Sequence, residues 1–174
     1  MIYADHAATT KISETAKLAM LSAMEKDWYN PSSLYTPGQQ ASGTLMDARV
    51  RIARCLGCLP KEIYFTSGGS EADNQAILSA AAIGKRQGKM HIISTAFEHH
   101  AVLHTLKKLE KEGFEITLLD VGEKGIVSPA QVEKAIRPDT ALVTVMYANN
   151  EIGTIQPTVS YTHLRAHETR SNLV

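Results

Sequence analysis

Hydrophobic and polar positions follow two different patterns along the chain, and the change comes near Glu62. Before it, apolar residues recur at helical spacing over Ser13–Lys26 and again over Gln39–Leu56. Ser13 has the short polar side chain of a helix N-cap. The segment between them, WYNPSSLYTPGQ, has the Asn, Pro, Ser and Gly residues of an irregular loop, and its aromatic residues favour an ordered one. We therefore expect two helices joined by a loop.

From Glu62 onward, short apolar runs alternate with helical segments. Four runs predict strands: IYF, MHIIS, FEITLLD and ALVTVMYA. Helices are predicted near Glu71–Lys85, His100–Glu112 and Pro129–Ile136. Because parallel strands need crossover connections, this order predicts an α/β fold whose mostly parallel sheet is covered on both faces.

Three polar loops follow the predicted strands, and they contain the candidate functional residues. In parallel sheets, ligands bind outside the carboxyl ends of the strands. The loops are therefore expected to converge on one site; their sequences are TSGGSEADN, STAFEHHAV and NNEIGTIQP.

The first of these loops, within YFTSGGSEADN, predicts an anion-binding turn. A strand runs into TSGGS and an acidic helical segment follows, so the first N–H groups of that helix are unpaired and lie at its positive end. The turn lacks the lysine of a nucleotide-triphosphate loop. Ser70 could instead only cap the helix, with Asp73 three residues on, but Gly68 and Gly69 favour the close approach of a ligand.

Composition indicates a cytoplasmic protein without a nucleic-acid or membrane partner. The 174 residues are 44% hydrophobic and 21% charged, which is enough to bury a core. Basic and acidic residues number 18 each, so the net charge is zero and favours no polyanionic partner. The opening MIYADHAATT lacks the basic and apolar regions of a signal peptide, and no apolar run is long enough to span a bilayer.

The two cysteines, Cys55 and Cys58, form a CxxC pair. A structural zinc site needs four ligands, and no further Cys or His pair is near. Redox pairs usually open a helix, whose N-terminus lowers the thiol pKa, whereas these cysteines end one. We expect them to be small buried residues at a helix end and predict no metal site.

Five sequence words carry a family resemblance: YADHAATT, NPSS, FTSGGSEADN, EHHAV and NNEIG. In this order and spacing they resemble the first part of cysteine desulfurases, pyridoxal-phosphate enzymes of the class-V aminotransferase superfamily. The resemblance covers residues 1–158 and departs at His6, where Asn or Tyr is common, and at Ser70, where Thr is usual. It implies the pyridoxal-phosphate transferase fold type I, with the mostly parallel sheet of its large domain truncated. Residues 1–12 would lie near the active site and residues 13–158 would form a partial cofactor-binding domain.

The same resemblance implies four residues that bind pyridoxal 5′-phosphate. Gly69 and Ser70 would hold the 5′-phosphate. His99 would stack on the cofactor ring and move protons in catalysis, whereas His100 is expected to be solvated. Asn150 would donate to the 3-hydroxyl oxygen and Asn149 would bind the loop backbone. Without the family context, the Asn pair would indicate only a turn.

The implied reaction converts L-cysteine to L-alanine and passes the sulfur to a protein cysteine persulfide for iron-sulfur cluster or thio-cofactor assembly. The full-length enzyme would be a homodimer that meets sulfur-acceptor or scaffold proteins. In the family, the cofactor-bearing lysine, the attacking cysteine, the acid at the pyridine nitrogen and the substrate-binding arginine follow NNEIG, so residues 1–174 are expected to be inactive alone. Selenocysteine lyase, another class-V aminotransferase-like enzyme and a non-catalytic module are the alternatives.

The final segment does not fit the family pattern. Residues 159–169, VSYTHLRAHET, resemble one reading frame of a transposase-type sequencing adapter. The family continues instead into another helix and the cofactor-anchoring strand. We therefore interpret residues 159–174 as an artefactual tail and leave them out of the fold prediction.

Overall fold

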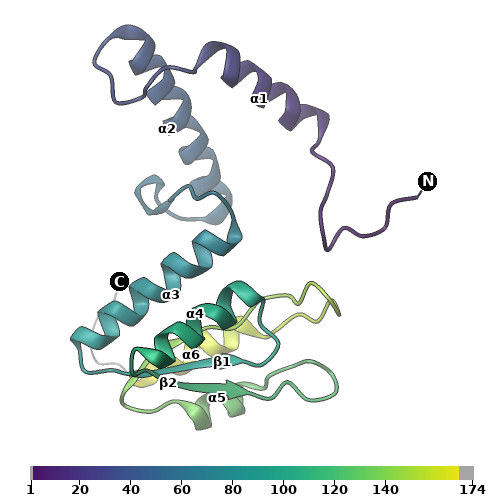
Figure 1. Ribbon diagram of the computed structural model, residues 1–174, viewed down its shortest axis with the longest axis vertical. Helices are drawn as coiled ribbons and strands as arrows, with labels where there is room; N and C mark the ends of the chain where they lie inside the picture. The colour runs from purple at the N-terminus through teal and green to yellow at the C-terminus, as the bar shows by residue number, and fades with distance from the viewer. Residues whose placement is uncertain (1, 169–174) are drawn as a thin grey trace. The chain divides into compact units, whose positions relative to one another are not determined.

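The computed structural model describes residues 2–168, which form two compact units, one up to Phe65 and one from Thr66 onward (Figure 1). The first unit contains the helices α1 (Glu14–Lys26) and α2 (Thr36–Leu56) and the short 3₁₀ helix η1 (Pro60–Glu62). Both α-helices were predicted from the hydrophobic periodicity.

Residues at the N-termini of α1 and α2 explain where these two helices begin. The Ser13 hydroxyl oxygen accepts a hydrogen bond from the Ala16 N–H at 3.2 Å, so Ser13 caps α1 as expected. α2 begins at Thr36, three residues before the predicted start at Gln39, and thereby shortens the loop. Pro37 in its first turn explains the earlier start, because the fixed φ of proline is already helical and its missing N–H has no partner to lose there.

Two predictions for the first unit were wrong. Ile63 has an extended backbone, but residues 63–65 pair with no other strand among the described residues, and Tyr64 is 74% exposed. An apolar run becomes a strand only where a partner takes its backbone hydrogen bonds. Cys55 is exposed and Cys58 is partly exposed, and the residues that α2 buries are Gly38, Ala41 and Ala53 instead.

The second unit contains a three-stranded parallel sheet in the order β2-β1-β3. Its strands are β1 (His91–Thr95), β2 (Glu115–Leu119) and β3 (Thr140–Val143). The parallel pairing confirms the sequence prediction. β3 ends earlier than the run ALVTVMYA suggests, because the Met146 N–H donates to the side chain of Glu98 instead of to a strand carbonyl.

Four helices accompany the sheet: α3 (Gly69–Arg86), α4 (His100–Lys111), α5 (Pro129–Ala135) and α6 (Thr158–Glu168). The first three were predicted within a few residues of these bounds. Within residues 2–168, each helix is too short or too polar to cross a bilayer.

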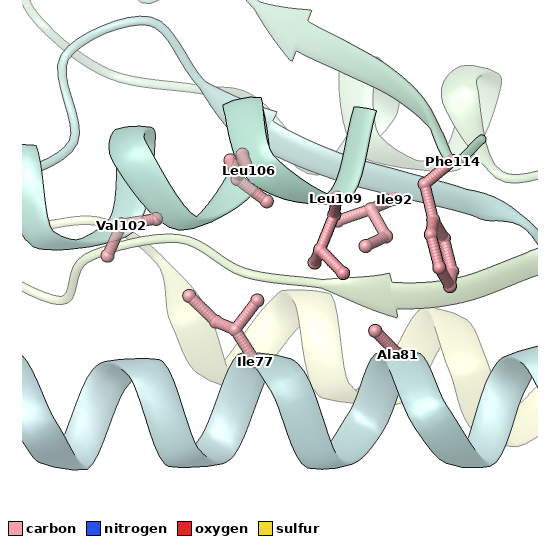
Figure 2. Close-up of a cluster of buried hydrophobic side chains, with 7 residues drawn as sticks. All are labelled: Ile77, Ala81, Ile92, Val102, Leu106, Leu109 and Phe114. Atoms are coloured by element: carbon pink, nitrogen blue, oxygen red, sulfur yellow. The ribbon is translucent and has the colours of Figure 1, made fainter. Parts of the chain in front are cut away.

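The core of this unit lies on both faces of β1, whose five residues are all buried. Ile92 and Ile93 are neighbours in the strand and therefore point to opposite faces. Ile92 packs in a cluster with α3 and α4, and Figure 2 shows these two helices facing each other across it. Ile93 packs with α5 and α6 in a second cluster, made of Ile93, Leu119, Val127, Val132 and Tyr161. Helices on both faces are the arrangement expected for a parallel sheet.

Tyr161 brings α6 into the second cluster. It is 8% exposed, and its hydroxyl donates to the Val127 carbonyl oxygen at 2.6 Å. The helix includes residues 159–168 of the segment that we interpret as an artefactual tail, and residues 169–174 of that segment lie outside the described residues. The origin of this segment stays a prediction.

His91 joins all three strands through its ring. Its Nδ1 lies 2.8 Å from the Thr140 hydroxyl and its Nε2 lies 2.8 Å from the Thr117 hydroxyl. Burial lowers the pKa of His91, and the nearby Arg137 guanidinium lowers it further. A buried, neutral imidazole with both nitrogens bonded is a structural residue, so His91 is not part of the candidate site.

Candidate functional site

The turn that we predict to bind an anion lies at the start of α3. Gly68 has an extended backbone (φ 167°, ψ −179°), and the helix begins at Gly69. Both the N–H and the hydroxyl of Ser67 donate to Glu71 Oε2 at 2.6 Å, and these bonds hold the pKa of Glu71 below its ordinary value. In the described part of the chain, the N–H groups of Gly69 and Ser70 have no acceptor. Two free donors at the positive end of a helix can bind an anion.

Ser70 is not the cap of this helix. The N-cap is Gly68, without a side-chain hydrogen bond, and Ser70 is the second helical residue. The simple capping alternative was therefore wrong. A Cβ atom added to Gly68 or Gly69 would meet no atom within 4 Å, and neither residue has the left-handed backbone conformation that favours glycine. Neither backbone conformation nor packing within the described residues requires these glycines, whereas a ligand that approaches the backbone would.

His99 is the N-cap of α4, directly after the loop that leaves β1. Its Nδ1 accepts a hydrogen bond from the Ala101 N–H at 3.1 Å. In the neutral ring this bond places the proton on Nε2. His99 is exposed, and its ring centroid lies 6.3 Å from that of His100 in a tilted arrangement. His100 is also exposed and stacks on His104, with ring centroids 5.6 Å apart.

Glu98 connects this loop to the one after β3, and sequence reasoning had not singled it out. It is 6% exposed, and its Oε1 accepts from the Thr95 hydroxyl at 2.7 Å and from the Met146 N–H at 2.9 Å. Burial raises the pKa of Glu98, and the negative charge of Asp73 on α3 adds to the rise, while the two donors oppose it. The carboxyl group therefore lies where α3 and both loops approach one another.

Asn149, in the loop after β3, donates a hydrogen bond back to the loop after β1. Its Nδ2 donates to the Phe97 carbonyl oxygen at 3.3 Å, and its Oδ1 accepts from the N–H groups of Glu151 and Ile152 at 2.9 and 3.0 Å. This confirms the prediction that Asn149 binds the loop backbone. Asn150 is exposed, and its Nδ2 donates to the Glu151 carboxylate at 3.1 Å.

Asn74 ties the turn at Ser70 to α4. Its Nδ2 donates to the Ser70 carbonyl oxygen at 2.6 Å, and its Oδ1 accepts from the Thr105 hydroxyl. Asn74 is four residues after Ser70 on the same helix, a spacing that could have indicated this role. Glu98 could have been suspected because it is a carboxylate between a buried strand and a helix cap.

Hydrogen bonds thus join the loops that follow β1 and β3, and Asn74 joins the first part of α3 to α4. Figure 1 shows α3 and α4 beginning on the side of this unit toward which the β1 arrow points. The four candidate residues, Gly69, Ser70, His99 and Asn150, lie on these loops and helix starts. Among the described residues, Ser70, His99 and Asn150 make no hydrogen bond or ring contact with one another.

The family comparison identifies the class of protein. Residues 2–172 match the family model described as Aminotransferase class-V, so the chain belongs to the class-V aminotransferases, a family of pyridoxal-phosphate-dependent enzymes.

Within that class, its relatives are cysteine desulfurases. The chain is 51% identical over 156 residues to the putative cysteine desulfurase IscS 1 of Bacillus subtilis (strain 168), which covers 90% of this chain and 41% of the relative. It is 49% identical over 156 residues to the cysteine desulfurase IscS of Methanosarcina thermophila, at 90% and 38% coverage. The family resemblance is confirmed, and the chain spans about two fifths of the length of these relatives.

Solved structures agree with this assignment. A NifS-like protein superposes with a TM-score of 0.91 and 35% identity, covering 98% of this chain and 46% of the other. The structure described as SspA in complex with cysteine gives a TM-score of 0.89 and 37% identity, covering 95% and 48%. These matches confirm the predicted α/β fold with its parallel sheet, and the partial coverage agrees with a truncated domain.

Proposed function

We propose that this chain is the cofactor-binding part of a cysteine desulfurase, which converts L-cysteine to L-alanine and transfers the sulfur to a protein cysteine persulfide. The identity to several cysteine desulfurases supports this function. The similar SspA structure is described as a complex with cysteine, which supports the substrate.

The turn at the start of α3 carries this proposal. The free N–H groups of Gly69 and Ser70, the Ser70 hydroxyl and the positive end of α3 suit the 5′-phosphate of pyridoxal phosphate. The open space around Gly68 and Gly69 would let phosphate oxygens reach the backbone. The residues present therefore fit the group, and they would bind it through hydrogen bonds without a lysine in the turn.

His99 and Asn150 would contact the ring. When bound, pyridoxal phosphate accepts the electrons that bond breaking leaves on the substrate carbon. His99 would lie against the ring, with its Nδ1 held by the Ala101 N–H, so that Nε2 is the atom that holds or moves a proton. Asn150 would turn its Nδ2 from the Glu151 carboxylate to the 3-hydroxyl oxygen, a small cost for an exposed side chain.

The rest of the enzyme belongs to the same proposal. The cofactor-bearing lysine, the attacking cysteine and the groups that bind the pyridine nitrogen and the substrate carboxylate would come from sequence that follows NNEIG in the family. The complete protein would be a cytoplasmic homodimer that delivers sulfur to acceptor or scaffold proteins for iron-sulfur cluster assembly.

Cofactor retention tests the proposed phosphate site. In a full-length protein that carries this sequence, Ser70→Asp would place a carboxylate beside the phosphate dianion. At about 4 Å and an effective dielectric constant of about 20, each pair of like charges costs about 4 kcal/mol, so affinity should fall more than about 100-fold. Ser70→Ala removes one charge-assisted hydrogen bond and should cost about 1–2 kcal/mol. His99→Ala should retain the cofactor with lower turnover.

Ser79→Asp is the matched control, because Ser79 is exposed on the same helix, nine residues further on. The measurement is the cofactor absorbance that remains after dialysis. If Ser70→Asp keeps its cofactor as well as Ser79→Asp does, the phosphate binds elsewhere and the proposal fails.

A further inference from the structure

Glu98 is buried without a positively charged partner. It is 6% exposed, and no salt bridge to it occurs among the described residues. The negative charge of Asp73, which is of the same sign, adds to the rise in the pKa of Glu98 that burial causes. A buried carboxyl group costs free energy that an apolar side chain would not. Packing alone therefore gives no reason for a glutamate at this position.

The hydrogen bonds of Glu98 supply a reason. One oxygen, Oε1, accepts both the Thr95 hydroxyl at the end of β1 and the Met146 N–H in the segment after β3. Asn149 returns the connection by donating to the Phe97 carbonyl oxygen. We call this pair of cross-links, from Glu98 to Met146 and from Asn149 to Phe97, the loop clasp.

The two side chains that form the loop clasp belong to residues that directly precede candidate-site residues. Glu98 is followed by His99, the N-cap of α4, and Asn149 is followed by Asn150. Asn149 also holds its own turn, because its Oδ1 accepts the N–H groups of Glu151 and Ile152. A shift of either loop would therefore change the separation between His99 and Asn150.

We propose that Glu98 is a positioning residue, which acts with Asn149 to hold His99 and Asn150 at the separation needed to contact one cofactor ring. The effect on the cofactor rests on the proposed function, whereas the hydrogen bonds of the loop clasp form in the chain without a ligand. Glu98 touches neither the phosphate turn nor the ring residues through its own hydrogen bonds, so its effect should be on cofactor orientation and not on phosphate anchoring.

The test uses variants of a full-length protein that carries this sequence. Glu98→Ala removes the acceptor, whereas Glu98→Gln keeps a side-chain oxygen that can accept both donors. Asn149→Asp loses the N–H that binds the Phe97 carbonyl and keeps the oxygen that holds the turn. Glu110→Ala is the control, because Glu110 is an exposed glutamate on α4.

Backbone hydrogen exchange without added cofactor measures the clasp directly. Exchange in residues 146–150 should rise about tenfold or more in Glu98→Ala and Asn149→Asp, with Glu98→Gln close to the parent and Glu110→Ala unchanged. If Glu98→Ala does not fold, Asn149→Asp still decides the outcome. Parental exchange rates in the folded Glu98→Ala or Asn149→Asp variant would overturn the clasp.

The visible circular dichroism of the bound cofactor measures the consequence. Glu98→Ala should retain the cofactor after dialysis but show a weaker or shifted dichroic band, and Glu98→Gln should restore the parental band. An unchanged band together with faster loop exchange would refute the positioning role. Failure of the proposed function gives a different result from failure of the positioning role. In that case Ser70→Asp would retain its cofactor, whatever the rates of hydrogen exchange are.

Discussion

Gly84 and Gly43 allow one substitution to be tested in two helices, with opposite expected results. Gly84 lies in α3, where an added Cβ would overlap the Cβ of Ala141 in β3 and would lie 3.1 Å from the Lys89 carbonyl oxygen. Gly43 lies in α2, where an added Cβ meets no atom within 4 Å. Alanine has a higher helix propensity than glycine by about 1 kcal/mol in either helix. Only at Gly84 does packing oppose this gain.

The expected changes in stability follow from the separation that non-bonded carbon atoms require. Non-bonded carbons attract best at about 3.5–4.0 Å, so Gly84→Ala must push α3 away from β3. Overpacking of this kind typically costs about 1–3 kcal/mol. After the propensity gain, we expect a net destabilisation of up to about 2 kcal/mol for Gly84→Ala and a stabilisation of about 0.5–1 kcal/mol for Gly43→Ala.

Urea unfolding of the parent and both variants measures the difference, with equal m-values as the check that only stability has changed. In thermal unfolding, a change of about 1 kcal/mol in the free energy of unfolding should shift Tm by about 2–4 °C for a chain of this size. A Gly84→Ala variant as stable as Gly43→Ala would show that α3 and β3 are not in the close contact described here.

Three further predictions concern the core, the surface charges and the polypeptide as a whole. Tyr161→Phe removes a donor to a buried carbonyl oxygen and should cost about 1–3 kcal/mol in urea unfolding, whereas Tyr147→Phe, at a 63% exposed residue, should be neutral. Arg137 holds the pKa values of Glu115 and Asp139 below their ordinary values through its hydrogen bonds, so these pairs stabilise the protein when the carboxylates are charged. Arg137→Ala should therefore lower Tm at pH 7, and the difference should disappear as the pH falls below 4.5 and the carboxylates become protonated; an equal difference at every pH would contradict this. The 174-residue polypeptide, incubated with pyridoxal phosphate, should release no sulfide from L-cysteine, and after dialysis it should retain no borohydride-reducible visible absorbance; observing either would refute the proposal that the cofactor-bearing lysine follows NNEIG.

The sequence by itself determined the elements whose signals lie within a few residues of one another. Ser13 caps α1 through a bond to Ala16, only three residues away, and the periodicity that predicts α4 is contained in that helix. The alternation of apolar runs and helices was enough to predict a parallel sheet, because a parallel strand can follow another only through a crossover. The family words then indicated which strand ends carry the candidate site.

Tertiary structure decided which of these signals had partners. The run IYF has strand-forming residues, yet no described strand takes its hydrogen bonds, and so it stays irregular. Ser70 has the side chain of a helix cap, but the N-cap of α3 is Gly68, two residues earlier. Glu98 and Met146 are 48 residues apart in sequence, and only the pairing of β1 with β3 brings the carboxylate to that N–H. Periodicity depends on near neighbours along the chain, whereas a hydrogen bond between distant loops depends on the packing of the whole sheet.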